Sequence, residues 1–91
     1  MKVCTSFKDR LIGLMFKNEL KEDYLFPNCK SIHTFFMKFN IDVIALNKNN
    51  QIIKIHKNVS PNKIIFMPTH TYAVLETKAN SNYKLNDIIK Y

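Results

Sequence analysis

The sequence is poor in the residues that mark several specialised classes of protein. Its two cysteines, Cys4 and Cys29, are too few for a disulfide framework, and its first residues, MKVCTSFKDR, lack the apolar segment of a secretion signal. No stretch approaches the roughly 18 consecutive apolar residues that a membrane span needs. We therefore expect reduced thiols, a soluble chain without a membrane span, and a cytoplasmic location.

Arginine is nearly absent from a chain that is otherwise basic. There are 14 lysine and arginine residues against 7 acids, a formal net charge of +7, and the single arginine is Arg10. A basic balance favours nucleic-acid binding, because lysines neutralise phosphates. The lysines are scattered among asparagine and isoleucine, however, and arginine is the residue best suited to bidentate phosphate or guanine contacts. Nucleic-acid binding is therefore the least favoured alternative.

The length and the apolar content indicate one folded domain. Ninety-one residues suffice for a single hydrophobic core and are too few for two, so we predict one domain over residues 1–91. The apolar fraction of 46% and the aromatic fraction of 12% are ordinary for a globular protein and argue against disorder.

One helix is predicted near the N-terminus. Ser6 and Asp9 have the spacing of a capping box, and Phe7 and Leu14 belong to one apolar stripe at helical spacing. We expect this helix to end near Phe16. The rest of the chain reads as strands and turns, with a hairpin turn at 48–51 and a further turn at 80–82. The predicted strands cover residues 24–26, 41–46, 51–59, 71–77 and 85–89, with a short strand or loop at 64–67.

The stretch SIHTFFMKFNID at residues 31–42 combines apolar bulk with polar ends. Phe35, Phe36 and Met37 stand together, which is more apolar bulk than a loop exposes without forming a patch. We predict that most of this stretch is core, either as a strand buried on both faces or as the lining of a cleft. Its polar ends, His33 and Asp42, mark the candidate site.

Several short motifs, in one order along almost the whole chain, resemble a known family. They are RLIGLM at 10–15, LF at 25–26, IHTFFM at 32–37, ID at 41–42, VLE at 74–76 and ND at 86–87. On these motifs the chain resembles the family called domain of unknown function 192, or uncharacterised protein family 0127. Where the family pattern has two glycines, this chain has Asn80 and Asn86, and asparagine tolerates the same left-handed backbone.

The resemblance implies a fold but no activity. It implies a mainly β domain, a small sandwich or jelly-roll-like barrel, here of about six strands with one short helix. The name of the family records that no activity is assigned. Many relatives carry a secretion signal or a membrane anchor. This chain shows neither, so a role outside the cytoplasm is not expected of it.

Two groups of chemically reactive or charged residues can be interpreted either as structural or as functional. Cys29 and His33 have half the spacing of a zinc site, but a fourth ligand is not evident, so we predict no metal and no cofactor. The same two residues with Asp42 could serve as nucleophile, base and orienting acid of a small enzyme. Arg10 could pair with Glu76 or Asp42 between helix and sheet, where a structural role is favoured over ligand binding.

We therefore predict a non-catalytic binding or accessory module. Its site is a shallow cleft lined by His33, Phe35, Asp42 and Arg10, with Glu76 as a further binding residue, and its partner is a protein or a small molecule. The small enzyme that uses Cys29, His33 and Asp42 is the alternative from a different class.

Overall fold

Strands and turns make up the part of the chain that the structure describes. The computed structural model describes residues 1–6, 14–15 and 17–91. Within these residues there is no helix, and so none with the length and apolar character to cross a membrane. The mainly β prediction is confirmed, whereas the predicted helix falls largely on residues 7–13 and 16, outside the described residues. The strands are β1 (Lys2–Val3), β2 (Tyr24–Pro27), β3 (Ser31–His33), β4 (Ile41–Leu46), β5 (Ile52–Val59), β6 (Ile64–Phe66) and β7 (Ala73–Lys78).

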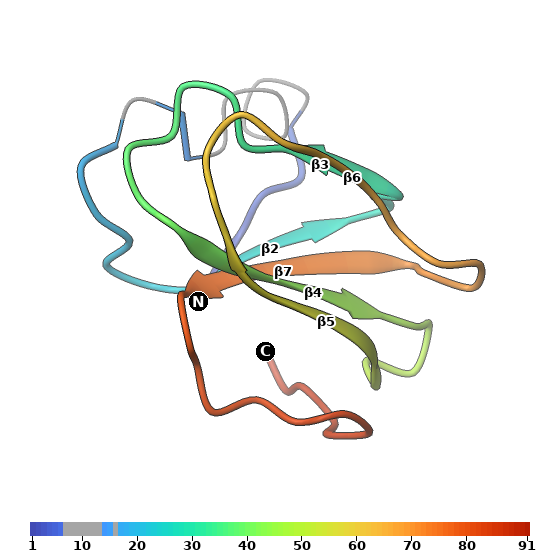
Figure 1. Ribbon diagram of the computed structural model, residues 1–91. Coiled ribbons are helices and arrows are strands. Elements are labelled where there is room, and N and C mark those ends of the chain that lie inside the picture. The colour runs from blue at the N-terminus through green and yellow to red at the C-terminus, as the bar shows by residue number, and fades with distance from the viewer. Residues whose placement is uncertain (7–13, 16) are drawn as a thin grey trace.

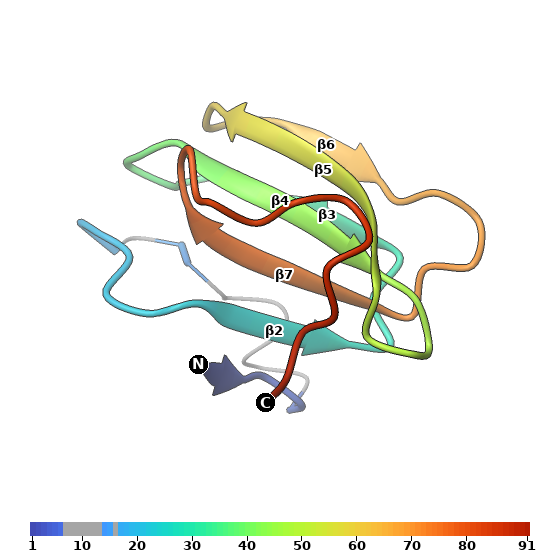
Figure 2. The ribbon, with the colours of Figure 1, turned by 90° about the horizontal axis from the view of Figure 1, so that it is seen from below.

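These strands form two sheets. The larger is mixed and has the order β1-β2-β7-β4-β5, in which only the β1–β2 pair is parallel. The smaller is the antiparallel pair β3–β6. Figure 1 shows the smaller sheet above one face of the larger sheet, and Figure 2 shows the C-terminal segment crossing the other face. Both faces of the larger sheet are therefore covered.

Strands β4 and β7 form the centre of the core. Every residue of β4 is buried, and so are all residues of β7 except Lys78. An uninterrupted run of buried residues is expected for a strand that is covered on both faces. The core has two clusters, one on each face of the larger sheet. The prediction of a central strand at residues 41–46 is confirmed.

Asparagine shapes the turns of a chain that has one glycine. The hairpin between β4 and β5 turns at Asn50, whose φ is 61°. The side chain of Asn47 supports this turn, because its Oδ1 accepts the backbone N–H groups of Asn49 and Gln51 at 2.9 and 3.1 Å. Asparagine enters the left-handed region at less cost than other residues with a Cβ. The predicted hairpin is confirmed.

A β-bulge interrupts the pairing of β4 with β5. Ile41 pairs with Val59 and Val43 pairs with His56, so Lys57 and Asn58 together lie opposite Asp42. The predicted strand at 51–59 is confirmed over Ile52–Val59, and the bulge changes which of its residues face inward.

The last predicted strand, at residues 85–89, is wrong. This segment makes one isolated bridge, between Gln51 and Ile88, and otherwise follows β5 through backbone hydrogen bonds of Ile52 with Asn86 and Asp87. Its buried residue is Ile89, which is 5% exposed and packs in the core cluster that also contains Leu25 and Ile44. The burial of Ile89 holds this segment against the core, although the segment lacks the regular pairing of a strand.

The stretch at residues 31–42 is divided between the core, where Ile32, Met37, Phe39 and Ile41 pack, and the surface. It contains β3, a turn and the first two residues of β4, and in the turn Phe35 and Phe36 are 37% and 60% exposed. Met37 and Ile41 are buried as predicted. The prediction was wrong for the two phenylalanines because the chain turns between two different sheets, which frees their side chains from both core clusters.

Candidate functional site

The side chains of the smaller sheet alternate between the core and the surface. Ile32 pairs with Ile65, and both pack against the core, so their neighbours along each strand point away from it. His33 pairs with Ile64, and Ser31 pairs with Phe66. We call the surface formed by Ser31, His33, Phe35, Ile64 and Phe66 the outer face.

The outer face is apolar and exposed. Ile64 is 57% exposed and Phe66 is 77% exposed. Phe35 joins them because its ring stacks on that of His33, with ring centroids 5.3 Å apart and an interplanar angle of 24°. In the predicted short strand or loop at 64–67, Ile65 and Met67 therefore pack against the core, whereas Ile64 and Phe66 are exposed.

A neighbouring turn adds a further exposed aromatic ring. Phe36 has a φ of 62°, which is unusual for a bulky residue and costs on the order of 1–3 kcal/mol. The turn holds this conformation because Thr34, before it, is fully buried. The Thr34 hydroxyl donates to Ser60 O at 2.9 Å and accepts the N–H of Lys63 at 2.8 Å. Strain in an exposed aromatic residue is a feature of binding sites more often than of inert loops.

His33 is oriented by the chain beside it. Its Nδ1 accepts the backbone N–H of Phe35 at 3.2 Å, which fixes the ring over Phe35 and leaves Nε2 available to a ligand. Among the predicted site residues, His33 and Phe35 are the two that the structure shows in contact.

Asp42 lies inside the fold, with no exposed surface. Its Oδ1 accepts the backbone N–H groups of Asn58 and Asn80 at 2.9 and 3.0 Å, and its Oδ2 accepts both the N–H and the hydroxyl of Ser81, at 2.8 and 3.0 Å. Burial by itself would raise the pKa of Asp42, but these hydrogen bonds outweigh burial and lower it. The carboxylate therefore joins the bulge in β5 to the turn after β7.

Glu76 is also buried, on the central strand β7. It is 5% exposed and lies in register with Tyr24 on β2 and Val43 on β4. Burial raises its pKa to about 8, so the carboxyl is largely protonated at neutral pH. Arg10, its predicted partner, lies outside the described residues, and the predicted ion pair remains a prediction.

The residues of the enzyme alternative each have other contacts. The Cys29 thiol donates to Ser31 O at 3.0 Å, the Nδ1 of His33 accepts from Phe35, and the Asp42 carboxylate is occupied as described above. Within the described part of the chain, no hydrogen bond joins any two of Cys29, His33 and Asp42. The described residues also contain no group of three or more side chains placed to hold a metal ion.

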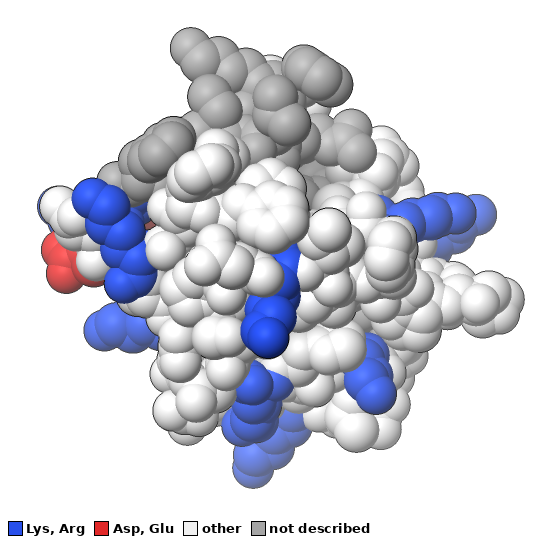
Figure 3. Space-filling model, turned by 45° about the horizontal axis from the view of Figure 1, so that its top comes forward, with Lys and Arg blue, Asp and Glu red and all other residues white. Residues whose placement is uncertain are grey.

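The exposed charge in the span of chain that includes the outer face has one sign. Residues 24–75, all of which the structure describes, contain one acid, the buried Asp42. The six lysines of this span are all exposed: Lys30, Lys38, Lys48, Lys54, Lys57 and Lys63. In Figure 3 lysines are spread over the left, central, lower and right parts of the view, and acids appear only at its left margin. The sequence reasoning missed Ile64 and Phe66, although a strand confined between two prolines and flanked by lysine was a usable signal for an edge strand.

The architecture defines a small, mainly β domain with two sheets, the smaller of which presents an exposed apolar face and has a lysine directly before each of its strands, Lys30 and Lys63. Residues 1–86 match the family model DUF192, described as "Uncharacterized ACR". The chain belongs to this family, as its motifs predicted. Comparison with curated proteins gave no match.

Two solved structures share the fold. A protein of unknown function from Novosphingobium aromaticivorans DSM 12444 is 22% identical, with a TM-score of 0.76, and the match covers 86% of this chain and 61% of that one. A protein from Sinorhizobium meliloti 1021, provisionally described as a transcription regulator, is 21% identical, with a TM-score of 0.76 and coverages of 85% and 66%. The chain thus spans less than two thirds of the length of either protein, and at these identities the likeness shows the fold alone.

Proposed function

We propose that this protein is a non-catalytic binding module whose outer face docks an acidic protein segment in an extended conformation. The observation that carries the proposal is the pair Ile64 and Phe66, which stand exposed on a two-stranded sheet in a span whose only exposed charges are lysines. Contiguous apolar surface with a charged rim marks an interaction site. His33 and Phe35, two of the predicted site residues, contribute the aromatic part of this surface.

The form of the partner follows from the geometry of the face. The smaller sheet has two strands, so β6 (Ile64–Phe66) has one side that pairs with β3 and another side without a strand partner among the described residues. An extended segment can add to such an edge through backbone hydrogen bonds. Alternate apolar side chains of that segment would cover Ile64 and Phe66, while its acidic side chains would meet lysines such as Lys63.

Other partners fit the face less well. Single-stranded nucleic acid would stack bases on aromatic rings, but Ile64, which pairs with His33 at one end of the smaller sheet, offers no ring. The enzyme alternative requires Cys29, His33 and Asp42 to act together, whereas each is bonded to a different group. The arrangement of two β layers supports the description of the domain as a small open sandwich.

Selection from a random library of short displayed peptides tests the proposal. We expect enriched peptides to alternate apolar and acidic residues and to bind more weakly as salt rises. Phe66→Ser and Ile64→Ser should each weaken binding at least about tenfold. The matched control is Leu85→Ser, because Leu85 is 59% exposed and belongs to the C-terminal segment on the opposite side of the larger sheet.

Three results would overturn the proposal. One is the absence of any enriched peptide, another is enrichment without an excess of acids, and the third is equal binding to the wild type and Phe66→Ser. Binding of single-stranded DNA or of phosphatidylserine vesicles that depends on Phe66, with no peptide binding, would assign the face to another class of partner. Sedimentation at increasing protein concentration identifies self-association as the occupant instead.

A further inference from the structure

An open pocket lies where three connections of the fold meet. It has a volume of about 840 Å³ and is lined by residues from the β2–β3 connection, the β4–β5 hairpin and the β6–β7 connection: Asn28, Lys30, Lys48, Thr69, His70, Thr71 and Tyr72. No residue of the outer face lines it. The pocket therefore carries an inference independent of the proposed function.

Backbone hydrogen bonds hold the walls of the pocket together. Tyr72 donates its N–H to Leu46 O at 2.7 Å, which fixes the β6–β7 connection to the end of β4. The carbonyl of Tyr72 accepts the N–H of Cys29 at 3.3 Å, and the carbonyl of Lys30 accepts the N–H of Met67 at 2.8 Å. These bonds link the β6–β7 connection to both of its neighbours, so the pocket exists before any ligand arrives.

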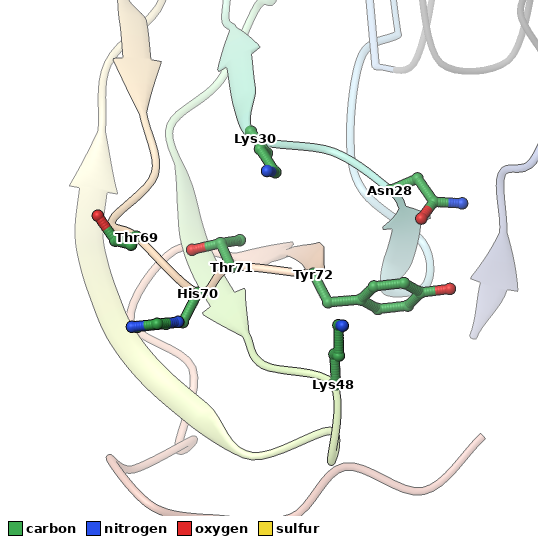
Figure 4. A pocket seen from close by; sticks show the side chains of 7 residues that line it. All are labelled: Asn28, Lys30, Lys48, Thr69, His70, Thr71 and Tyr72. Atoms are coloured by element: carbon green, nitrogen blue, oxygen red, sulfur yellow. The ribbon is translucent and has the colours of Figure 1, made fainter.

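The backbone conformation of two lining residues is unusual. Asn28 has a φ of 56° and His70 has a φ of 75°. Asparagine accepts such angles readily, but for histidine the left-handed region costs on the order of 1 kcal/mol. The hydroxyl of Thr71 donates to Pro68 O at 2.7 Å and closes the turn in which His70 adopts this angle. The turn sets the imidazole at the edge of the pocket (Figure 4).

The charge in the pocket is entirely positive. In Figure 4 the ammonium groups of Lys30 and Lys48 approach the pocket from opposite sides, each pointing toward the other across Thr71 and Tyr72. The lining contains no acid. An anion that enters between these two ammonium groups is attracted to both. The hydroxyl of Thr69 adds a hydrogen-bond donor to the lining.

We propose that this pocket binds the phosphate group of a small phosphomonoester. Two ammonium groups match the charge of a phosphate dianion, and lysine binds phosphate as a point charge without a fixed orientation. A planar carboxylate is best held by the fork of an arginine, and the lining contains none. The three walls leave room beside Tyr72 for the organic part of the ester, which an aromatic ring can cover.

Titration of the isotope-labelled protein with phenyl phosphate, followed by amide NMR shifts at low ionic strength, tests the site. We expect saturating shifts that cluster at residues 28–30, 48 and 69–72. Lys30→Gln and Lys48→Gln should each weaken binding about tenfold or more, because each removes one charge-assisted contact. Lys90→Gln removes the same charge from an exposed position outside the pocket and should change the affinity less than about twofold.

The same spectra show whether each variant is folded, so a loss of binding cannot be confused with unfolding. Equal weakening by Lys90→Gln would show attraction to net charge and overturn the site. Shifts spread over lysine-bearing segments outside the pocket, such as residues 54–57 and 84, or shifts that never saturate, would overturn it as well. A parallel titration with benzoate separates phosphate from carboxylate, and equal or tighter binding of benzoate would overturn the choice of phosphate.

Discussion

Replacement of the buried acid Glu76 by glutamine should stabilise the fold, and the gain should grow with pH. Glu76 is 5% exposed on the central strand, and burial raises its pKa from 4.5 to about 8. The folded protein therefore keeps a proton that the unfolded chain releases in this range. Because the unfolded state binds fewer protons, the free energy of unfolding falls as pH rises from 4.5 to about 8.

The size of this loss follows from the pKa difference. Each pH unit in the window lowers the free energy of unfolding by about 1.4 kcal/mol, so the whole window amounts to about 4 to 5 kcal/mol. The stability that Glu76 contributes is fully present below pH 4.5 and is lost as pH rises through about 8. Glutamine has nearly the same shape and cannot ionise, so Glu76→Gln should not show this loss.

Urea unfolding of the wild type and of Glu76→Gln, at several values from about pH 5 to about pH 9, measures the effect. The chain has four tyrosines and no tryptophan, so tyrosine fluorescence or circular dichroism reports unfolding. The variant should exceed the wild type by less than about 1 kcal/mol near pH 5 and by about 3 kcal/mol or more near pH 9. The control is Glu19→Gln, which makes the same substitution at an exposed position.

The test rests on the difference in the free energy of unfolding between Glu76→Gln and the wild type, and not on the pH dependence of either protein alone. Burial, together with the nearby Lys54, lowers the pKa of His56, which makes stability rise with pH below about 6.5. This opposite trend is common to both proteins and cancels in the difference. A difference between Glu76→Gln and wild type that stays constant from acid to alkaline pH would refute the reasoning, because it would show that Glu76 ionises alike in the folded and unfolded chains.

Three further substitutions test other parts of the fold by thermal and urea unfolding. Asp42→Asn should lower the free energy of unfolding by about 2 to 4 kcal/mol, because an NH₂ group replaces one carboxylate oxygen and faces the N–H of Ser81. A loss below about 1 kcal/mol would contradict the hydrogen bonds described for Asp42. Leu75→Ala should cost about 2 to 5 kcal/mol, because Leu75 is fully buried, and Phe66→Ala should cost less than about 0.5 kcal/mol, because Phe66 is exposed. Similar costs for the two substitutions would show that Phe66 belongs to the core. Phe36→Asn should raise the free energy of unfolding by up to about 1 kcal/mol, and a loss would mean that the φ of 62° carries no strain.

The sequence was most informative where a local pattern decides the structure. Residues 41–46 are apolar on both faces and form the buried strand β4, and the polar turn after them contains Asn50, which takes the positive φ that the hairpin needs. Such elements depend on residues that are close in sequence. The motifs at residues 10–15 and 32–37 also identified the family, because several matches in one order rarely occur by chance.

Contacts between distant segments were beyond the local pattern. The Asp42 carboxylate binds the amides of residues 58, 80 and 81, and no spacing in the sequence indicates that these three amides meet. The exposure of Phe35 depends in the same way on the position of β3 apart from the larger sheet. Hydrophobicity alone predicted that Phe35 lies in the core. The topology of the two sheets instead leaves it exposed.

The short exposed strand β6 also bears on how the protein avoids aggregation. An apolar segment at a sheet edge is a template for pairing with identical chains, and Ile64–Phe66 followed by Met67 has this character. Lys63 lies directly before the segment and Pro68 directly after Met67. A charge and a residue without an N–H group, placed at the two ends of such a segment, oppose the growth of a stacked sheet. These two flanking residues thus allow the chain to keep an apolar edge exposed at cellular concentrations.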